Sequence, residues 1–385
     1  MANAFPYLLL VIFYGVLAIL HKYFLESSEK VKYINILTIF VFIIFFGLRG
    51  FVAYDWTVYY SLFYERIPKL GQLFTIPPSK WAVEPGFVLL ASTCKTLFTD
   101  YIVFQFICTT INICLLVRFF SRYTKNLPAC MVLFITMGGI GFSTDLIRNS
   151  LSIFIFLNGI EFIEKKRFIP YLLICLCSAS FHNSGLAYIP MYIILNRKFN
   201  KYILLTIFII ANAICILHIP VFKNLISLFV NIISPKMAQY MDTYMSYDAS
   251  NTSAFNIGFL ERLFTGVMVF CYINKLRELR KSNILVNSMF IYLFINLFLS
   301  EFRTISIRCS NLFVFAYWII WQDLIKCIYY KGNKILYMVF IGCYCLLKAY
   351  SGNSGPMSQY YNVLFDYKTH TERTLYFRQH LNDKK

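Results

Sequence analysis

Four arginines lie where apolar runs of the chain begin or end: Arg49, Arg148, Arg303 and Arg308. Arginine presents a planar fork of N–H donors that binds phosphate oxygens bidentately, which lysine cannot do. An arginine at the end of a membrane span also snorkels to lipid headgroups, so position alone does not decide its role. Arg148 lies at the start of an expected helix, where the helix dipole disfavours a cation unless an anion binds beside it. The four arginines are therefore candidate ligands for a phosphate-bearing anion.

Sequence spacing bears on the roles of three of these arginines. Asp145 precedes Arg148 by three residues, so an ion pair within one helix is the alternative there. Arg303 and Arg308 are five residues apart, and on one regular helix their side chains would point about 140° apart. A ligand shared by both arginines therefore requires Arg303 to lie before the helix or in a broken turn.

Three further residues have side chains that can move a proton: Glu84, Asp55 and His182. Glu84 precedes Pro85 at the start of a short apolar run, where a carboxylate is also ordinary helix capping. A single histidine at a membrane interface is most often structural, and its alternative role is general base or hydrogen-bond donor to a leaving oxygen. These three residues are candidate acid–base groups.

Tyrosines supply the last candidate ligands, namely Tyr59, Tyr240 and Tyr244. With Tyr247, the last two follow the spacing i, i+4, i+7, which places them on one face of a helix. Anchoring at the membrane interface is the plainer explanation. A stacking platform for sugar rings would use the same rigid apolar faces.

The composition indicates that these residues are positioned by helices in a lipid bilayer. Of 385 residues, 59% are hydrophobic and only 14% are charged, and the mean hydropathy is +0.62. These values exclude an ordinary soluble domain. The net charge of +18 comes from basic residues in short connections between apolar runs, which indicates positive-inside topology and not nucleic-acid binding.

Twelve apolar runs are expected to cross the membrane as helices. They cover about 4–25, 32–48, 101–121, 127–143, 147–163, 168–181, 184–196, 201–219, 257–275, 284–300, 305–325 and 334–350. Placing every basic connection in the cytoplasm requires the run 86–98 to be a re-entrant or shallow helix, with both termini outside. The predicted fold is an all-α polytopic membrane protein. It has about 12 transmembrane helices in one domain over 1–350, outer segments at 49–85 and 219–256, and a polar tail at 351–385.

Several familiar kinds of site have no signature in the sequence. The 12 cysteines lie mostly inside apolar runs and show neither metal-site nor disulfide spacing. Nucleophile-elbow, zinc-protease, P-loop and EF-hand patterns are also missing. We therefore expect no metal and no cofactor.

The candidate residues fall in a series of short motifs on the predicted outer side. They are G-L-R-G…Y-D…Y-Y (47–60), E-P-G-F (84–87), L-I-R-N-S-L (146–151), S-F-H-N-S-G-L…P (180–190) and F-R…S-I-R-C-S (302–310). Their order and spacing over roughly residues 40–320 resemble the EpsG family, a group of Wzy-type polymerases for O-antigen, capsule and exopolysaccharide repeat units.

This resemblance implies a GT-C-like, metal-independent glycosyltransferase of the bacterial inner membrane, with its active site at the periplasmic or outer face. Its substrates would be oligosaccharides on undecaprenyl diphosphate, and a chain-length regulator protein is a candidate partner. The four arginines would be the motif arginines that clamp the diphosphate, and Glu84, Asp55 and His182 the motif acid and histidine positions. A developing diphosphate charge is stabilised by fixed guanidiniums.

Three other functions remain open from the sequence. An O-antigen ligase would share the fold class and donor and differ in its acceptor. A polysaccharide flippase would move lipid-linked units without lengthening them, although arginines on one side only disfavour it. No pattern favours a membrane acyltransferase.

Overall fold

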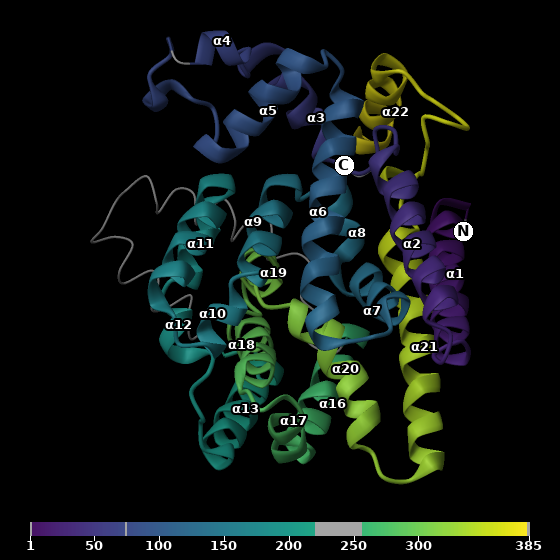
Figure 1. Ribbon diagram of the computed structural model, residues 1–385, viewed down its shortest axis with the longest axis vertical. Helices are drawn as coiled ribbons and strands as arrows, with labels where there is room; N and C mark the ends of the chain where they lie inside the picture. The colour runs from purple at the N-terminus through teal and green to yellow at the C-terminus, as the bar shows by residue number, and fades with distance from the viewer. Residues whose placement is uncertain (1, 74, 220–255, 383–385) are drawn as a thin grey trace. The chain divides into compact units, whose positions relative to one another are not determined.

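The computed structural model describes residues 2–73, 75–219 and 256–382, and this part of the chain is helical with one isolated β-bridge, between Arg49 and Asn362 (Figure 1). It divides into two compact units, Met1–Tyr192 with Leu336–Lys385, and Ile193–Ile335. The prediction of one transmembrane domain over 1–350 stays a prediction.

The first unit contains the longer helices. They are α1 (Phe5–Tyr23), α2 (Ser28–Phe42), α3 (Trp56–Ser61), α4 (Leu70–Leu73), α5 (Pro85–Leu97), α6 (Tyr101–Tyr123), α7 (Leu127–Phe134), α8 (Ile140–Thr144), α9 (Ile147–Leu157), α10 (Ile160–Glu164), α11 (Phe168–Phe181), most of α21 (Lys331–Asn353) and α22 (His370–Asn382). π-Helical turns η2 (Ile43–Gly47), η3 (Leu62–Arg66) and η5 (Ile135–Gly139) follow α2, α3 and α7, and 3₁₀ turns are η1 (Ala2–Ala4), η4 (Pro78–Lys80), η6 (Asn183–Tyr188) and η7 (Pro356–Ser358).

The second unit is built around α18. Its helices among the described residues are α13 (Lys201–Ile216), α16 (Ile257–Cys271), α17 (Ile273–Arg280), α18 (Ile284–Phe298), α19 (Arg303–Asn311) and α20 (Phe315–Cys327), and the chain passes from one unit to the other within α12 (Met191–Ile194). Helix α18 packs against α13, α19 and α20. A bidentate ion pair at 2.6 Å joins Arg280 at the end of α17 to the buried Asp323 of α20.

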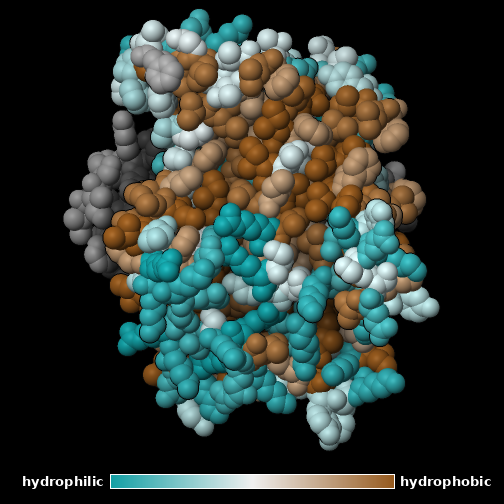
Figure 2. All heavy atoms as spheres, in the orientation of Figure 1, coloured by the Kyte–Doolittle hydropathy of each residue, from teal (hydrophilic) through white to brown (hydrophobic). Residues whose placement is uncertain are grey.

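The expectation of an all-helical polytopic membrane protein is confirmed. Among the described residues, five helices are long and apolar enough to cross a bilayer, or up to seven if each sharply bent pair (α16 with α17, α19 with α20) is one span. Apolar side chains of the long helices face outward, such as Ile19 of α1 at 70% exposed and Phe40 of α2 at 58%. Figure 2 shows hydrophobic side chains over a broad part of the visible surface. Such faces are expected where lipid is the solvent.

The predicted count of 12 spans is not confirmed. The run 184–196 is not one continuous helix, since it forms η6 and the four-residue α12 around Pro190. Proline lacks the N–H that would continue a helix, which explains the break. The run 147–163 is likewise divided into α9 and α10 at Asn158–Gly159. The run 86–98 does form a short helix, α5, of 13 residues.

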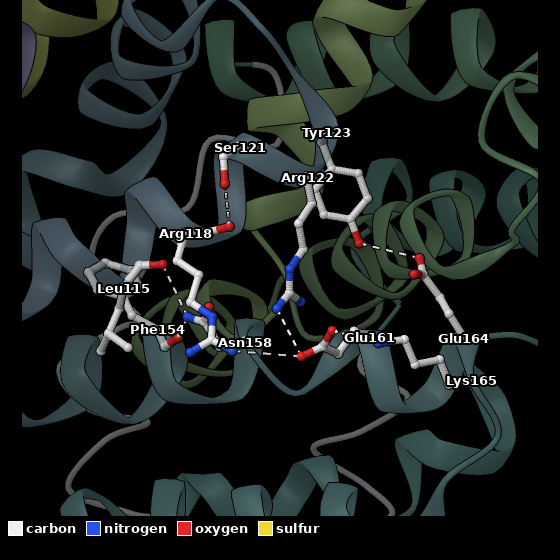
Figure 3. A network of polar contacts seen from close by, with 10 residues as sticks. All are labelled: Leu115, Arg118, Ser121, Arg122, Tyr123, Phe154, Asn158, Glu161, Glu164 and Lys165. Carbon is white, nitrogen blue, oxygen red and sulfur yellow. Dashed lines mark hydrogen bonds and ion pairs between the residues drawn. The ribbon is translucent and has the colours of Figure 1, made fainter. Parts of the chain in front are cut away.

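A cluster of charged residues joins the end of α6 to α10 (Figure 3). Glu161 pairs with Arg122 at 3.0 Å, Lys165 at 3.1 Å and Arg118 at 3.8 Å. The Tyr123 hydroxyl donates to Glu164 over 3.5 Å. The basic residues of this region therefore hold the end of α6 and helix α10 together.

The segment after α21 is folded onto the first unit and is not a loose tail. Backbone hydrogen bonds run from Gly50 N to Tyr361 O at 2.8 Å and from Val363 N to Leu48 O at 2.8 Å. The Asn362 amide donates to Ile44 O at 3.0 Å. The chain beyond residue 355 therefore covers the end of the second long helix, next to Arg49.

Candidate functional site

Arg148, the second residue of α9, lies between two side chains from distant parts of the chain. Its Nη1 donates to Glu84 Oε2 over 2.6 Å, and its Nε donates to the Tyr59 hydroxyl over 2.9 Å. The side chains of Arg148 and Glu84 are only 26% and 10% exposed. Solvent and salt screen such a sheltered pair less than a surface pair. The pair therefore ties the start of α9 to the start of α5.

Glu84 also contacts the segment that carries the predicted histidine. It is the N-cap residue of α5, and its Oε1 accepts a hydrogen bond from the backbone N–H of Asn183 over 3.2 Å. Asn183 directly follows His182. Three of the predicted site residues, Tyr59, Glu84 and Arg148, thus meet through their side chains, and the segment of a fourth, His182, joins them.

Two glycines allow these segments to approach so closely. A Cβ atom on Gly86 would lie 2.4 Å from Ser180 Oγ and 2.9 Å from Ser180 O, so only glycine lets α5 pack on the end of α11. A Cβ on Gly185 would lie 2.5 Å from Ala179 N. The E-P-G and H-N-S-G motifs therefore contain glycine for packing, and their polar residues reach one site as a result.

His182 is held by the turn that follows it. Its Nδ1 accepts from the backbone N–H of Ser184 over 3.2 Å and lies 2.7 Å from Ser184 Oγ. Ser184 Oγ in turn donates to Asn149 Oδ1 over 3.1 Å. These contacts fix the orientation of the His182 ring.

The electrostatics of the site favour an ionised Glu84. Burial raises the pKa of the Glu84 carboxyl, but its own backbone N–H, the charge of Arg148 and the N–H of Asn183 outweigh burial and lower the pKa below its ordinary value. Burial raises the pKa of Tyr59, and Arg148 offsets this only in part. A carboxylate paired with arginine is a weak base. In this arrangement Glu84 serves as the counter-ion of Arg148.

The sequence model of the EpsG family matches residues 32–365, which include every residue of the Arg148 site. This chain belongs to the EpsG family. No curated protein and no solved structure matches it. EpsG is a Wzy-type polymerase-related family, and its members are polymerase-like membrane proteins of polysaccharide biosynthesis.

The sequence analysis offered an ion pair between Asp145 and Arg148 as the simple alternative. In this EpsG-family chain the two side chains do not pair. Asp145 lies before α9 begins, and its Oδ1 accepts from the backbone N–H groups of Tyr54 at 2.7 Å and Asp55 at 3.0 Å. Asp55 is the N-cap residue of α3. The Asp145 carboxylate thus fixes the start of the helix that carries Tyr59. The acid–base role of Asp55 stays a prediction.

Arg49 is a buried residue in the EpsG-family fold, at 2% exposed. Its guanidinium donates to the carbonyl oxygens of Phe46 and Thr144, and its own carbonyl accepts from the Gln105 amide at 2.8 Å. These contacts link η2, α6 and α8. Diphosphate binding by Arg49 stays a prediction, while the structure shows a bracing role.

Arg303 and Arg308 belong to the second compact unit, and both are exposed. Helix α19 begins at Arg303, after the N-cap Phe302, so both arginines lie on one helix. Their predicted role in binding diphosphate is not tested by this geometry. Tyr240 and Tyr244 lie outside the described residues.

Two partners in the site region of this EpsG member could not be predicted from the sequence. One is the backbone of Asn183, because main-chain donors leave no residue-type signal. The other is Lys95 of α5, whose Nζ donates to the carbonyls of Tyr64 at 2.8 Å and Ile67 at 2.7 Å and so ties α5 to η3. Within the described residues, no group of three or more His, Cys, Asp or Glu side chains is placed to hold a metal ion.

Proposed function

We propose that this chain is a polysaccharide polymerase that joins oligosaccharide repeat units carried on undecaprenyl diphosphate, at the outer face of the bacterial inner membrane. The observation that supports this best is the Arg148 site. An arginine at a helix N-terminus, largely covered and held by Glu84 and Tyr59, lies beside a histidine-bearing turn in a family of polymerase-like proteins. The predicted topology places all of these residues on the outer side.

In the proposed reaction, Arg148 binds the diphosphate of the donor. The N-terminus of α9 favours an anion there, and the guanidinium fork matches phosphate oxygens. As the bond between the sugar C1 and the diphosphate oxygen breaks, negative charge grows on the leaving undecaprenyl diphosphate. A fixed guanidinium stabilises that charge in the transition state. The His182 ring is the second group that we assign as a hydrogen-bond donor to a leaving oxygen.

Glu84 is the base that we assign to the acceptor. When a phosphate oxygen takes a share of the Arg148 guanidinium, Glu84 loses part of its counter-ion and its pKa rises toward the ordinary value. The freed carboxylate accepts the proton of the acceptor hydroxyl, and the hydroxyl oxygen forms the new bond to C1 from the opposite face. The products are the lengthened lipid-linked glycan and undecaprenyl diphosphate, with inversion at C1.

Purified full chain supplied with lipid-linked repeat units tests this function. A polymerase lengthens these units without any other acceptor, whereas a ligase needs its own acceptor and a flippase leaves their length unchanged. Arg148→Ala should abolish lengthening, and Arg148→Lys should restore little because it lacks the fork. Arg118→Ala is the matched control, since this arginine is 65% exposed and lies in the cluster on α6. Unchanged lengthening by Arg148→Ala would rule out the proposed clamp.

A further inference from the structure

The C-terminal helix α22 begins beyond the range matched by the family, which ends at residue 365. Its Arg373 is nonetheless a buried residue, only 2% exposed. The Arg373 Nε donates to the carbonyl of Phe51 over 2.9 Å, and its guanidinium lies 4.7 Å from the ring of Tyr361 and 4.8 Å from that of Tyr376. Burying a guanidinium is costly unless its partners compensate. Such a contact is not expected of a loosely attached tail.

A second contact comes from His370 at the start of α22. Its ring stacks on Tyr60 with 3.8 Å between ring centroids and 11° between the planes. The same ring meets Phe51 and Trp56 edge-on, each at 5.5 Å. Further along α22, Phe377 packs edge-on against Trp56 at 5.9 Å. Aromatic pairs at these separations each add to the docking of the helix.

These contacts converge on a short part of the chain, residues 51–61, that contains α3. Helix α3 has six residues, too few to be stable without tertiary contacts. Asp145 holds the residues just before the helix, through the N–H groups of Tyr54 and of the N-cap Asp55. Helix α22 contacts Phe51 before α3, and Trp56 and Tyr60 within it. Tyr59 lies between these fixed points, and its hydroxyl accepts from Arg148.

We propose that α22 is a clasp on α3 that holds Tyr59 in place to orient Arg148. His370 and Arg373 are positioning residues in this arrangement, acting through α3 and not on the substrate. The effect on catalysis rests on the proposed function, while the effect on α3 does not. Losing the clasp leaves the unit folded around its long helices and lets α3 shift, so that Arg148 loses one of its two side-chain partners.

The test uses the full chain with Arg373→Ala and, as matched control, Arg378→Ala, an exposed arginine of the same helix. Hydrogen exchange of the amides in residues 51–61 is the first measurement. We expect Arg373→Ala to speed exchange there at least about 10-fold without a change in α6, and Arg378→Ala to match the wild type. Unchanged exchange in residues 51–61 overturns the clasp, whether or not the chain is a polymerase.

The second measurement is the rate of lengthening of lipid-linked units. Arg373→Ala should slow lengthening at least about 10-fold, and in a Tyr59→Phe background the same change should have little further effect, because both act through one contact. Independent effects that simply multiply would overturn the route through Tyr59. If the wild type lengthens nothing while exchange in α3 still responds, the proposed function fails and the clasp stands.

A further pair of variants tests the clasp even if Arg373→Ala folds poorly. His370→Phe keeps an aromatic ring against Tyr60, whereas His370→Ala removes it. The clasp predicts near-normal exchange in residues 51–61 for the phenylalanine variant and fast exchange for the alanine variant. Equal exchange in these two variants would contradict it.

Discussion

Arg148 Nη1 and Glu84 Oε2 lie 2.6 Å apart, although 64 positions separate the two residues in the chain. The contact joins the first turn of α9 to the N-cap of α5. A buried ion pair adds little net stability compared with apolar packing, but removing one partner strands the other charge. Its value here is the fixed geometry of a cation and a carboxylate at the ends of two helices.

Glu84→Gln should lower the rate of lengthening at least about 100-fold, the usual contribution of a general base. The amide keeps an oxygen that can accept from Asn183 N–H, but Arg148 loses its counter-ion, so the unfolding temperature should fall as well. Lengthening of lipid-linked units and thermal unfolding in detergent are measured together. A normal rate in Glu84→Gln would contradict Glu84 as the general base and assign that role to Asp55 or His182.

The stability contributed by ionised Glu84 should depend on pH in the acid range alone. The folded pKa of Glu84 lies below its ordinary value of 4.5. Stability from such a group is fully present above the unfolded pKa and is lost as pH falls through the folded pKa. The difference in unfolding temperature between wild type and Glu84→Gln should therefore be constant near neutrality and shrink below about pH 4.5. A difference that shrinks between pH 8 and 6 would contradict the lowered pKa.

Gly86→Ala should disturb the site without touching any charged group. The new Cβ would meet Ser180 Oγ at 2.4 Å and the Ser180 carbonyl at 2.9 Å. Forcing such a contact typically costs about 1–3 kcal/mol and would move Glu84 away from Arg148. Thermal unfolding and lengthening should both decline. Ser180→Gly in the same chain should recover part of the loss, and Gly71→Ala is the control because nothing lies within 4 Å of its added atom.

Asp145→Ala should loosen the start of α3, because two backbone N–H groups lose a charged acceptor. Leaving such donors without their partner costs about 1–3 kcal/mol. Asp145→Asn keeps an acceptor oxygen and should cost less. Chemical denaturation ranks the variants, and an equal loss in both would show that charge, and not the hydrogen bonds, holds the segment.

Composition and apolar runs were sufficient to predict an all-helical membrane protein, because lipid imposes both helix and hydrophobicity. They were less reliable for the number of spans. The run 184–196 is mostly apolar, yet Pro190 and the tight packing at Gly185 divide it. Hydropathy reports where a chain can enter lipid, whereas backbone hydrogen bonding decides whether it crosses as one helix.

The motif residues of the site were found, but not their partners. Spacing favoured Asp145 as the partner of Arg148, since residues three apart are neighbours on a helix. The structure begins α9 at Ile147, which leaves Asp145 outside that helix. Glu84 could not be chosen from the sequence, because the contact depends on how α5 packs on α11. Helix α22 was missed because its mixed polar sequence looks like a tail.

The pairing of Arg148 with Glu84 also bears on the order in which substrates must bind. A carboxylate held by its arginine cannot draw a proton from a hydroxyl or from water until an anion competes for that arginine. On the proposed mechanism, the enzyme faces water and glycans at the outer surface of the membrane and stays inactive until the donor binds. Wasteful hydrolysis of lipid-linked sugars would then be suppressed by the same contact that prepares the transfer.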